Sequence, residues 1–392
     1  MINLPKSLLS LRDLKTLSKN FRFDLPGQTS RASLLEGVPD FGSNPGDLKM
    51  WMYLPQQIPD RRPLVVVLHG CGQTAAAYDS GAGWSTLADR YGFALLMPEQ
   101  QRTNNPNGCF NWFQPGDAQR GHGEAASIRQ MIETMVRDHA VDPHRVFVTG
   151  LSAGGAMTSV MLACYPDVFE AGAIVAGLPY GTAASVQQAL EAMYQCPARS
   201  PKEWGDAARH AYPSYRGPWP RVSIWHGGAD RTVAPNNARE IIKQWAFVHG
   251  LSLTPSLTDT VDGYPRQLWL DGNGKELIES YSITHMAHGT PLSTGDADAQ
   301  CGAAGPFLLE AGISSSFHIA RFFGLTEAGA KPIAARTIQE ISAAGTIVPE
   351  AAARSAPAGE RAPDWARVRG TGSRIDIGAI IGKALAAAGL MK

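Results

Sequence analysis

The sequence has no surplus of charge of either sign and no long apolar run. Its 392 residues include 35 basic and 35 acidic side chains, so the formal net charge at pH 7 is zero. Because a strongly basic field is the usual mark of a nucleic-acid-binding protein, we expect no nucleic acid among its partners. No apolar run reaches the ~18 residues that a transmembrane helix needs, so we expect no membrane span.

Cysteine is also scarce, and the spacing of the five cysteines matches no zinc motif. We therefore expect no metal ion and no cofactor. The odd number leaves at least one thiol outside any intramolecular disulfide. The five are Cys71, Cys109, Cys164, Cys196 and Cys301.

The first 21 residues place leucines at helical spacing, but charged residues at positions 12, 13 and 15 interrupt them. This pattern is typical of an amphipathic helix rather than of the unbroken apolar core of a secretory signal. We therefore expect a cytoplasmic protein, and secretion or a periplasmic location stays open as the alternative.

From residue 48 to 327 the sequence alternates apolar strand-like runs with helical stretches. This alternation is typical of an α/β domain with a mainly parallel central sheet flanked by helices. We predict strands at 49–55, 64–70, 93–99, 145–150, 171–177, 221–227, 267–270 and 276–283, and helices near 84–91, 124–139, 153–165, 236–249 and 312–323. A hairpin turn is expected at 271–274. Residues 1–47 would be an N-terminal extension, and residues 328–392 an Ala/Pro/Gly-rich linker with a C-terminal helix that either docks or stays free.

One serine lies in a glycine-rich turn between a predicted strand and a predicted helix. The stretch "VFVTGLSAGG" places Ser152 between Gly150 and Gly154, directly before the helix predicted at 153–165. This G-x-S-x-G pattern is typical of a tight turn that exposes a nucleophilic hydroxyl at a helix N-terminus. A chance glycine-rich turn or a helix-capping serine would give the same pattern. The assignment of Ser152 as a nucleophile therefore depends on whether suitable partner residues follow in the chain.

An acid and a histidine follow this serine in the order that such a nucleophile requires. Asp230 lies in "WHGGADRTV", where the strand predicted at 221–227 ends, and a turn aspartate is the structural alternative. The stretch "HMAHGTP" offers His285 and His288 after the last strand. We expect His285 to lie at the strand end and to point elsewhere. We therefore predict Ser152, Asp230 and His288 as nucleophile, acid and base.

Acyl transfer also needs N–H donors for the oxyanion. One candidate is the backbone N–H of Ala153, directly after the serine, and the other is that of Cys71 in "LHGCGQT". The aromatic residues Trp112 and Phe113 in "CFNWF" follow closely in the chain. They either line an apolar substrate groove or belong to the core.

Several long strings of this sequence resemble the polyhydroxybutyrate depolymerase family of esterases, which is related to feruloyl and acetylxylan esterases. They are "LHGCGQT", "GCFNWF", "GLSAGGAMTSVMLACYPDVFEAGAIVAGLPYG", "WHGGADRTV", "HMAHGTPLS" and "CGAAGPFLLEAGISSSFHIARFFGL". The resemblance covers residues 48–325 and implies an α/β-hydrolase fold without a metal. It also implies the roles given above for the nucleophile, acid, base and oxyanion donors, which are Ser152, Asp230, His288, Cys71 and Ala153. The sequence departs from secreted members in two respects: neither their usual signal peptide nor a separate polymer-binding domain is recognisable, and "GLPYG" lacks the Arg-Cys pair that often follows this tyrosine in them.

The resemblance therefore predicts a serine ester hydrolase that acts through an acyl-enzyme on poly- or oligo(3-hydroxybutyrate)-type esters. A feruloyl or acetylxylan esterase is the first alternative. A non-catalytic protein that binds a polyester or carbohydrate surface is the second, and a peptidase ranks below esterase. The oligomeric state stays open.

Cys71 and Cys109 each lie on a loop that follows a predicted strand. Such loops gather at one edge of a parallel sheet. We therefore predict a disulfide between them that fixes the Cys71 N–H, although a reducing cytosol would oppose it.

Overall fold

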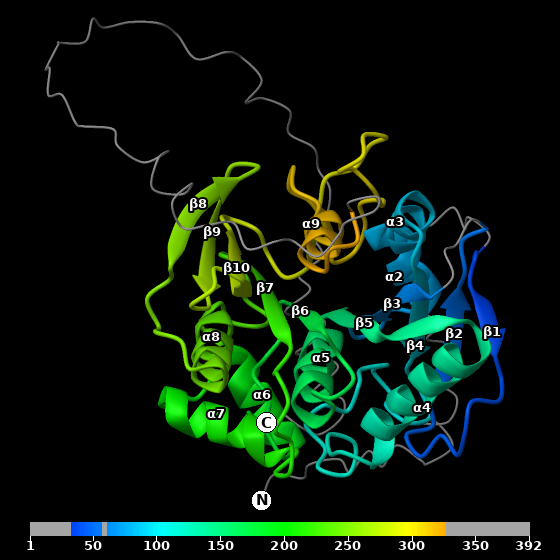
Figure 1. The fold of residues 1–392 in the computed structure, drawn as a ribbon, viewed down its shortest axis with the longest axis horizontal. Helices are drawn as coiled ribbons and strands as arrows, with labels where there is room; N and C mark the ends of the chain where they lie inside the picture. Colours follow the sequence, from blue (N-terminus) through cyan, green and yellow to red (C-terminus); the bar gives the residue numbers. More distant parts are fainter. Residues whose placement is uncertain (1–32, 57–60, 327–392) are drawn as a thin grey trace, which may run out of the picture. The chain divides into compact units, whose positions relative to one another are not determined.

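The computed structural model describes residues 33–56 and 61–326, which form an α/β fold (Figure 1). The N-terminal helix and the C-terminal linker and helix predicted above lie outside these residues. The strands are β1 (Glu36–Val38), β2 (Lys49–Tyr53), β3 (Arg62–Leu68), β4 (Ala94–Glu99), β5 (Val141–Leu151), β6 (Ala171–Val175), β7 (Arg221–Gly227), β8 (Leu257–Val261), β9 (Tyr264–Leu270), β10 (Glu276–Ile283), β11 (Thr290–Leu292) and β12 (Leu308–Glu310). The helices are α2 (Ala75–Ala82), α3 (Trp84–Tyr91), α4 (Gly123–Asp138), α5 (Ala153–Cys164), α6 (Val186–Tyr194), α7 (Pro201–His210), α8 (Asn236–His249) and α9 (Ser315–Phe322).

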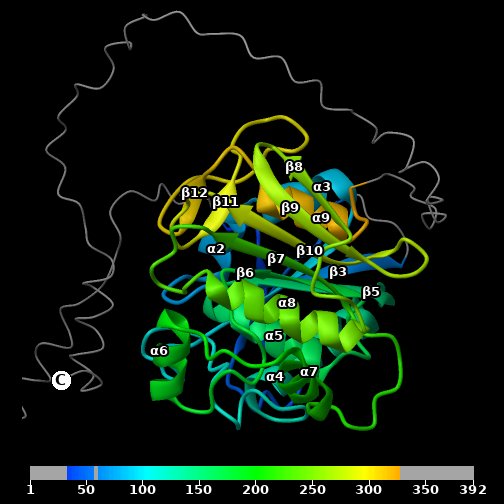
Figure 2. The same cartoon turned by 90° about the vertical axis from the view of Figure 1, so that its left-hand side faces the viewer.

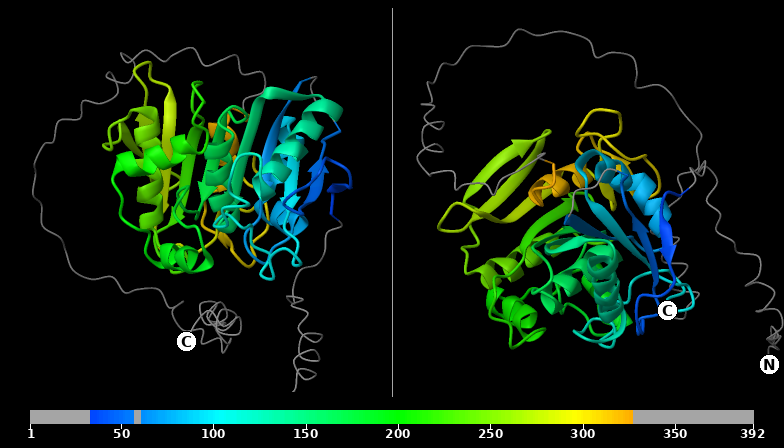
Figure 3. Two further views of the ribbon diagram at one scale, coloured as in Figure 1. Left: turned by 90° about the horizontal axis from the view of Figure 1, so that it is seen from below. Right: turned by 45° about the vertical axis from the view of Figure 1, so that its right-hand side comes forward.

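The central sheet has the strand order β1-β2-β4-β3-β5-β6-β7-β10-β9-β8. Its middle block, from β4 to β10 in this order, is parallel. The pairs β1–β2, β2–β4, β9–β10 and β8–β9 at the two sides are antiparallel. The two sides lie at opposite ends of the twisted sheet, in blue and in yellow-green (Figure 3). All strands of the parallel block therefore end at one edge, where ligands bind in such folds.

Helices cover both faces of this sheet (Figure 2). Helices α4, α5 and α8 pack on one face, and α2, α3 and α9 on the other. Strand β3 shows how two cores arise from one strand, because successive side chains point to opposite faces. Leu64 and Val66 join the first core, whereas Val65 and Val67 join the second. A strand buried on both faces needs a continuous apolar run, which is the signal that located these strands in the sequence.

The predicted α/β fold is confirmed, and each strand and helix predicted within the described residues overlaps an observed element. The hairpin turn at 271–274 is also confirmed, because the N–H of Asp271 donates to the Lys275 carbonyl between antiparallel β9 and β10. The sequence reading missed three helices (α2, α6, α7) and four short strands (β1, β8, β11, β12). Helix α7 had a sequence signal: Ser200 and Glu203 form a capping box, with Pro201 at the helix start.

Candidate active site

Ser152 occupies a strained turn between β5 and α5. Its backbone has φ 57° and ψ −115°, a region that serine rarely adopts. A side chain at Gly150 would collide with the Gly154 carbonyl, and one at Gly154 with the Leu68 carbonyl. Glycine at both positions is therefore a requirement of the turn, as the G-x-S-x-G spacing predicts. The carbonyl of Val175 at the end of β6 accepts from the Ser152 N–H at 2.9 Å and fixes the turn to the sheet.

A chain of hydrogen bonds joins this serine to a buried histidine and a buried aspartate. The Ser152 hydroxyl lies 2.9 Å from His288 Nε2, and His288 Nδ1 lies 2.7 Å from Asp230 Oδ2. A carboxylate can only accept, so Nδ1 carries the proton of the neutral ring and Nε2 is free to accept from the serine. The structure thus brings together the three residues that the sequence reading selected.

Three strands of the parallel block place these three side chains. Ser152 follows β5, Asp230 follows β7, and His288 lies between β10 and β11. Two hydrogen bonds tie the loops after β7 and β10 to each other: Gly228 N–H donates to Ile283, and Ala229 N–H to Met286. The spacing of acid and base is therefore set by backbone bonds between adjacent loops.

His285, the other candidate base, lies apart from this arrangement. Strand β10 ends at Ile283, and His285 follows in a turn with φ 63° and an exposed side chain. The Ser152 hydroxyl is hydrogen-bonded to His288 instead.

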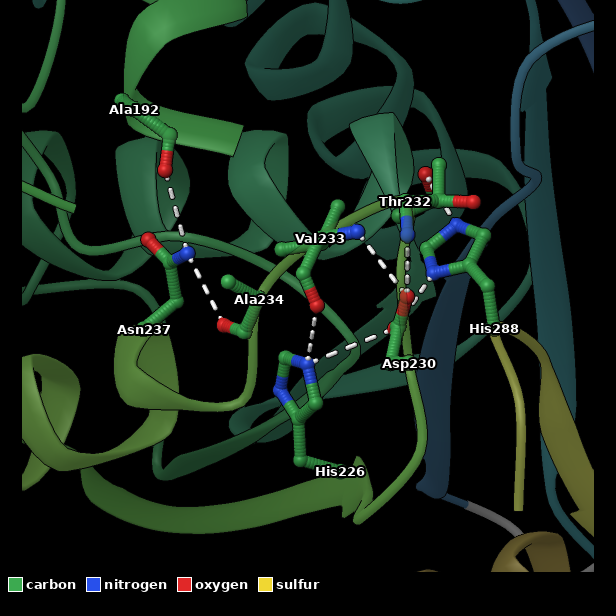
Figure 4. Close-up of polar contacts among 9 residues, drawn as sticks. Ala192, His226, Asp230, Thr232, Val233, Ala234, Asn237 and His288 are labelled. Atoms are coloured by element: carbon green, nitrogen blue, oxygen red, sulfur yellow. Dashed lines mark hydrogen bonds and ion pairs between the residues drawn. The ribbon is translucent and has the colours of Figure 1, made fainter. Parts of the chain in front are cut away.

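Asp230 is held in its charged form. Burial alone would raise the pKa of this carboxyl, but hydrogen bonds from His226 and His288 outweigh it and hold the pKa well below its usual range. The backbone N–H groups of Thr232 and Val233 add donors to Oδ1 at 2.8 and 2.9 Å. Figure 4 shows these contacts. A permanently ionised Asp230 can stabilise a positive charge on His288.

The loop after β3 lies beside the serine turn, and hydrogen bonds hold it in one conformation. The Gln73 N–H donates to the Gly70 carbonyl at 3.2 Å, and the Gly70 N–H donates to Gln73 Oε1 at 2.9 Å. Buried His69 adds a link: the Gln100 N–H donates to its Nε2, so Nδ1–H donates to the Gly70 carbonyl at 2.8 Å. Cys71 lies within this loop, and a disulfide joins it to Cys109. The predicted disulfide is confirmed.

Ala153, the second predicted donor, is the first residue of α5. The first N–H groups of a helix have no acceptor within it, so this position can serve an anion. The oxyanion role of Cys71 and Ala153 stays a prediction.

Trp112 and Phe113 lie mainly in the core. Trp112 is only 8% exposed and belongs to the cluster under α4 and α5, whereas Phe113 is partly buried against the same cluster. Their loop is held by buried Glu124, whose carboxylate accepts from the Asn111 N–H at 2.8 Å and from Gln100 Nε2 at 2.6 Å. A substrate role for the two aromatics stays a prediction, with little of Trp112 left to contact a ligand.

Two features near the site were absent from the sequence reading. Phe307 packs edge-to-face on the His288 ring, with centroids 6.0 Å apart, and has a φ of 62°. A cavity of about 340 Å³ borders the fixed loop and is lined by Lys49, Gly108 and the segments 72–74 and 99–103. Neither has a sequence signal, because both bring together segments far apart in the chain.

The described residues contain no group of three or more His, Cys, Asp or Glu side chains arranged to hold a metal ion. They also contain no helix long and apolar enough to cross a membrane.

The parallel sheet and the strained serine with its hydrogen-bonded histidine define an α/β-hydrolase. The model of the esterase PHB depolymerase family matches residues 48–256, more than half of the chain. The chain belongs to this family, and it is a carboxylic ester hydrolase.

The relatives differ in the substrate that their names give: poly(3-hydroxyalkanoate) for one, and acetylxylan or feruloyl esters for others. Poly(3-hydroxyalkanoate) depolymerase C of Paucimonas lemoignei is 48% identical over 297 residues, which cover 76% of this chain and 72% of that protein. Acetylxylan esterase of Coprinopsis cinerea is 39% identical over 276 residues (68% and 72%), and feruloyl esterase B of Neurospora crassa is 35% identical over 299 residues (74% and 96%). An acetyl xylan esterase structure from Aspergillus awamori has a TM-score of 0.59 at 30% identity, covering 65% of this chain and 93% of that one.

Proposed function

We propose that this protein hydrolyses poly- or oligo(3-hydroxybutyrate)-type esters through an acyl-enzyme formed on Ser152. The observation that carries the substrate class is the 48% identity to a poly(3-hydroxyalkanoate) depolymerase over three quarters of the chain. The observation that supports the chemistry is the hydrogen-bonded series Ser152, His288 and Asp230.

The geometry supports a two-step reaction. His288 Nε2 takes the proton of the Ser152 hydroxyl while the oxygen attacks the ester carbonyl. Asp230 stabilises the imidazolium that forms, and the N–H groups of Cys71 and Ala153 hold the oxyanion. His288 then gives the proton to the leaving alcohol. In the second step a water loses a proton to His288 and attacks the acyl carbonyl. The bond to the Ser152 oxygen then breaks and releases the acid, while His288 returns the proton to that oxygen.

The cavity beside the loop after β3 supports a substrate that extends beyond the scissile ester. Its lining offers hydrogen-bond donors on Arg102 and Thr103, whereas the Gln101 amide already donates to Asp47. The carboxylate that it contains, Glu99, already accepts the Ala75 N–H at 2.9 Å and faces Lys49 at 3.7 Å. A polyester chain presents many carbonyl acceptors and almost no donors, so it suits a lining rich in donors.

The second candidate function is deacetylation of xylan, which the Aspergillus awamori structure and the Coprinopsis cinerea relative favour. The test is kcat/KM on soluble 3-hydroxybutyrate dimers and trimers, measured beside acetylated xylan and methyl ferulate. Ser152→Ala is the matched control for hydrolysis without the nucleophile. We expect at least a tenfold preference for the hydroxybutyrate esters. The same preference for either of the other substrates would overturn the proposal in favour of a plant-wall esterase.

A further inference from the structure

A second histidine lies against the carboxylate of Asp230. His226, near the end of β7, places its Nε2 2.9 Å from the Val233 carbonyl and 3.4 Å from Asp230 Oδ2 (Figure 4). Both side chains are almost completely buried, with 4% and 0% exposed. His226 is therefore inside the protein, and it lies on the side of Asp230 opposite to His288 (Figure 4).

The two neighbours of His226 Nε2 fix the proton on this ring. A carbonyl and a carboxylate can both only accept, so Nε2 carries the proton; it donates to the Val233 carbonyl, and Asp230 Oδ2 lies 3.4 Å from the same nitrogen. Nδ1 is buried without a hydrogen-bond partner among the described residues. A proton there would be a buried donor with no acceptor, which costs free energy. Nε2 is therefore the donor nitrogen of this ring, close to Asp230.

His226 closes a short loop around the carboxylate. The Val233 carbonyl accepts from His226, and the N–H of the same residue donates to Asp230 Oδ1 at 2.9 Å. Asp230 Oδ2 meanwhile lies between the two histidines, 2.7 Å from His288 Nδ1. Oδ1 is thus held by two backbone N–H groups and Oδ2 by His288, with His226 close against Oδ2 as well, so the carboxylate cannot rotate without losing a donor.

We propose that His226 is a positioning residue that holds the Asp230 carboxylate and its loop in the orientation needed by His288. It acts through Asp230 and touches no reacting atom. This inference rests on the proposed roles of Ser152, Asp230 and His288, and it adds a donor to which the family comparison assigns no role.

Two amide variants test whether the position of the donor or only the volume of the side chain at residue 226 matters. In His226→Gln the amide nitrogen can reach the position of Nε2, where both acceptors lie. In His226→Asn the amide nitrogen reaches only the position of Nδ1, where no acceptor lies. Kinetics on soluble hydroxybutyrate trimers, Tm by calorimetry, and the far-downfield NMR signal of the His288 Nδ1 proton are measured for both variants and for the wild type.

We expect His226→Asn to lower kcat roughly 10–100-fold with KM within about twofold, and to shift or broaden the His288 proton signal. His226→Gln should retain kcat within about threefold, together with the wild-type signal. Equal kinetics in the two variants, or a loss that follows Tm instead of donor position, would overturn the inference. An unchanged signal in His226→Asn would overturn it too. Because the NMR signal needs no substrate, it tests the inference even if Ser152→Ala shows that the proposed reaction is wrong.

Discussion

Removing the disulfide between Cys71 and Cys109 should change stability and turnover together. The bridge spans a sequence separation of 38 residues. In the chain-entropy model, closing a loop of that length in the unfolded chain is worth about 4 kcal/mol at 25 °C. For a domain of this size we expect the double variant Cys71→Ala/Cys109→Ala to lose about 6 °C in Tm. The double variant is preferred because a single substitution leaves a reactive thiol at the site.

The same variant tests the oxyanion role of the Cys71 N–H. The turn from Gly70 to Gln73 keeps its own hydrogen bonds without the bridge. The N–H should therefore become less well placed rather than lost. A donor that is removed outright costs about 3 kcal/mol of barrier, so we expect a smaller fall in kcat, about tenfold, with KM little changed. Calorimetry and p-nitrophenyl ester kinetics, with and without reductant, provide the measurement. A double variant with wild-type Tm and kcat would refute both the stability estimate and the role of the loop.

Two further predictions concern the site and the buried acids. Ser152→Ala should lower kcat on the order of a million-fold and leave the circular dichroism spectrum unchanged. His288→Ala should lower kcat as much, whereas His285→Ala should lower it much less. If His285→Ala lowered kcat more than His288→Ala, the base would be His285. Burial raises the pKa of Glu279 from 4.5 to about 7, so this residue makes stability fall as pH rises from about 4.5 to 7, by about 3 kcal/mol in all. Glu279→Gln should flatten that part of the stability profile in urea titrations from pH 4 to 8, and an unchanged slope would contradict the assignment.

The sequence located the elements that have strong local signals. Strands buried on both faces are continuous apolar runs, and α4, α5 and α8, with 16, 12 and 14 residues, are the longest helices of the described residues. Apart from α7, whose capping box is a sequence signal, the misses are short or exposed: β8 carries mostly polar side chains on an outer strand, and α2 contains a glycine within eight residues. In these segments tertiary packing outweighs local propensity.

The site residues also differ in whether a local sequence signal predicts them. Ser152, Asp230 and His288 could be selected because each lies in a loop directly after a predicted strand, and parallel strands bring such loops together. His226 lies within β7, so the sequence around it is typical of a core strand and not of a site loop. Its position against Asp230 depends on the path of the loop back to Val233, which no local pattern specifies. Phe307 is separated from His288 by an intervening loop, and its contact is equally invisible in the sequence.

Trp112 shows how an aromatic beside a site differs from an aromatic in it. The sequence reading left groove and core open, and the structure gives Trp112 8% exposure and an edge-to-face contact with Phe113. Trp112→Ala should then act first on stability, with a loss of about 3–5 kcal/mol from the cavity it leaves. Trp112→Phe, which fills most of that volume, should retain both Tm and KM for hydroxybutyrate trimers. If Trp112→Ala instead kept the wild-type Tm and raised KM for trimers but not for p-nitrophenyl acetate, the side chain would belong to the substrate groove after all.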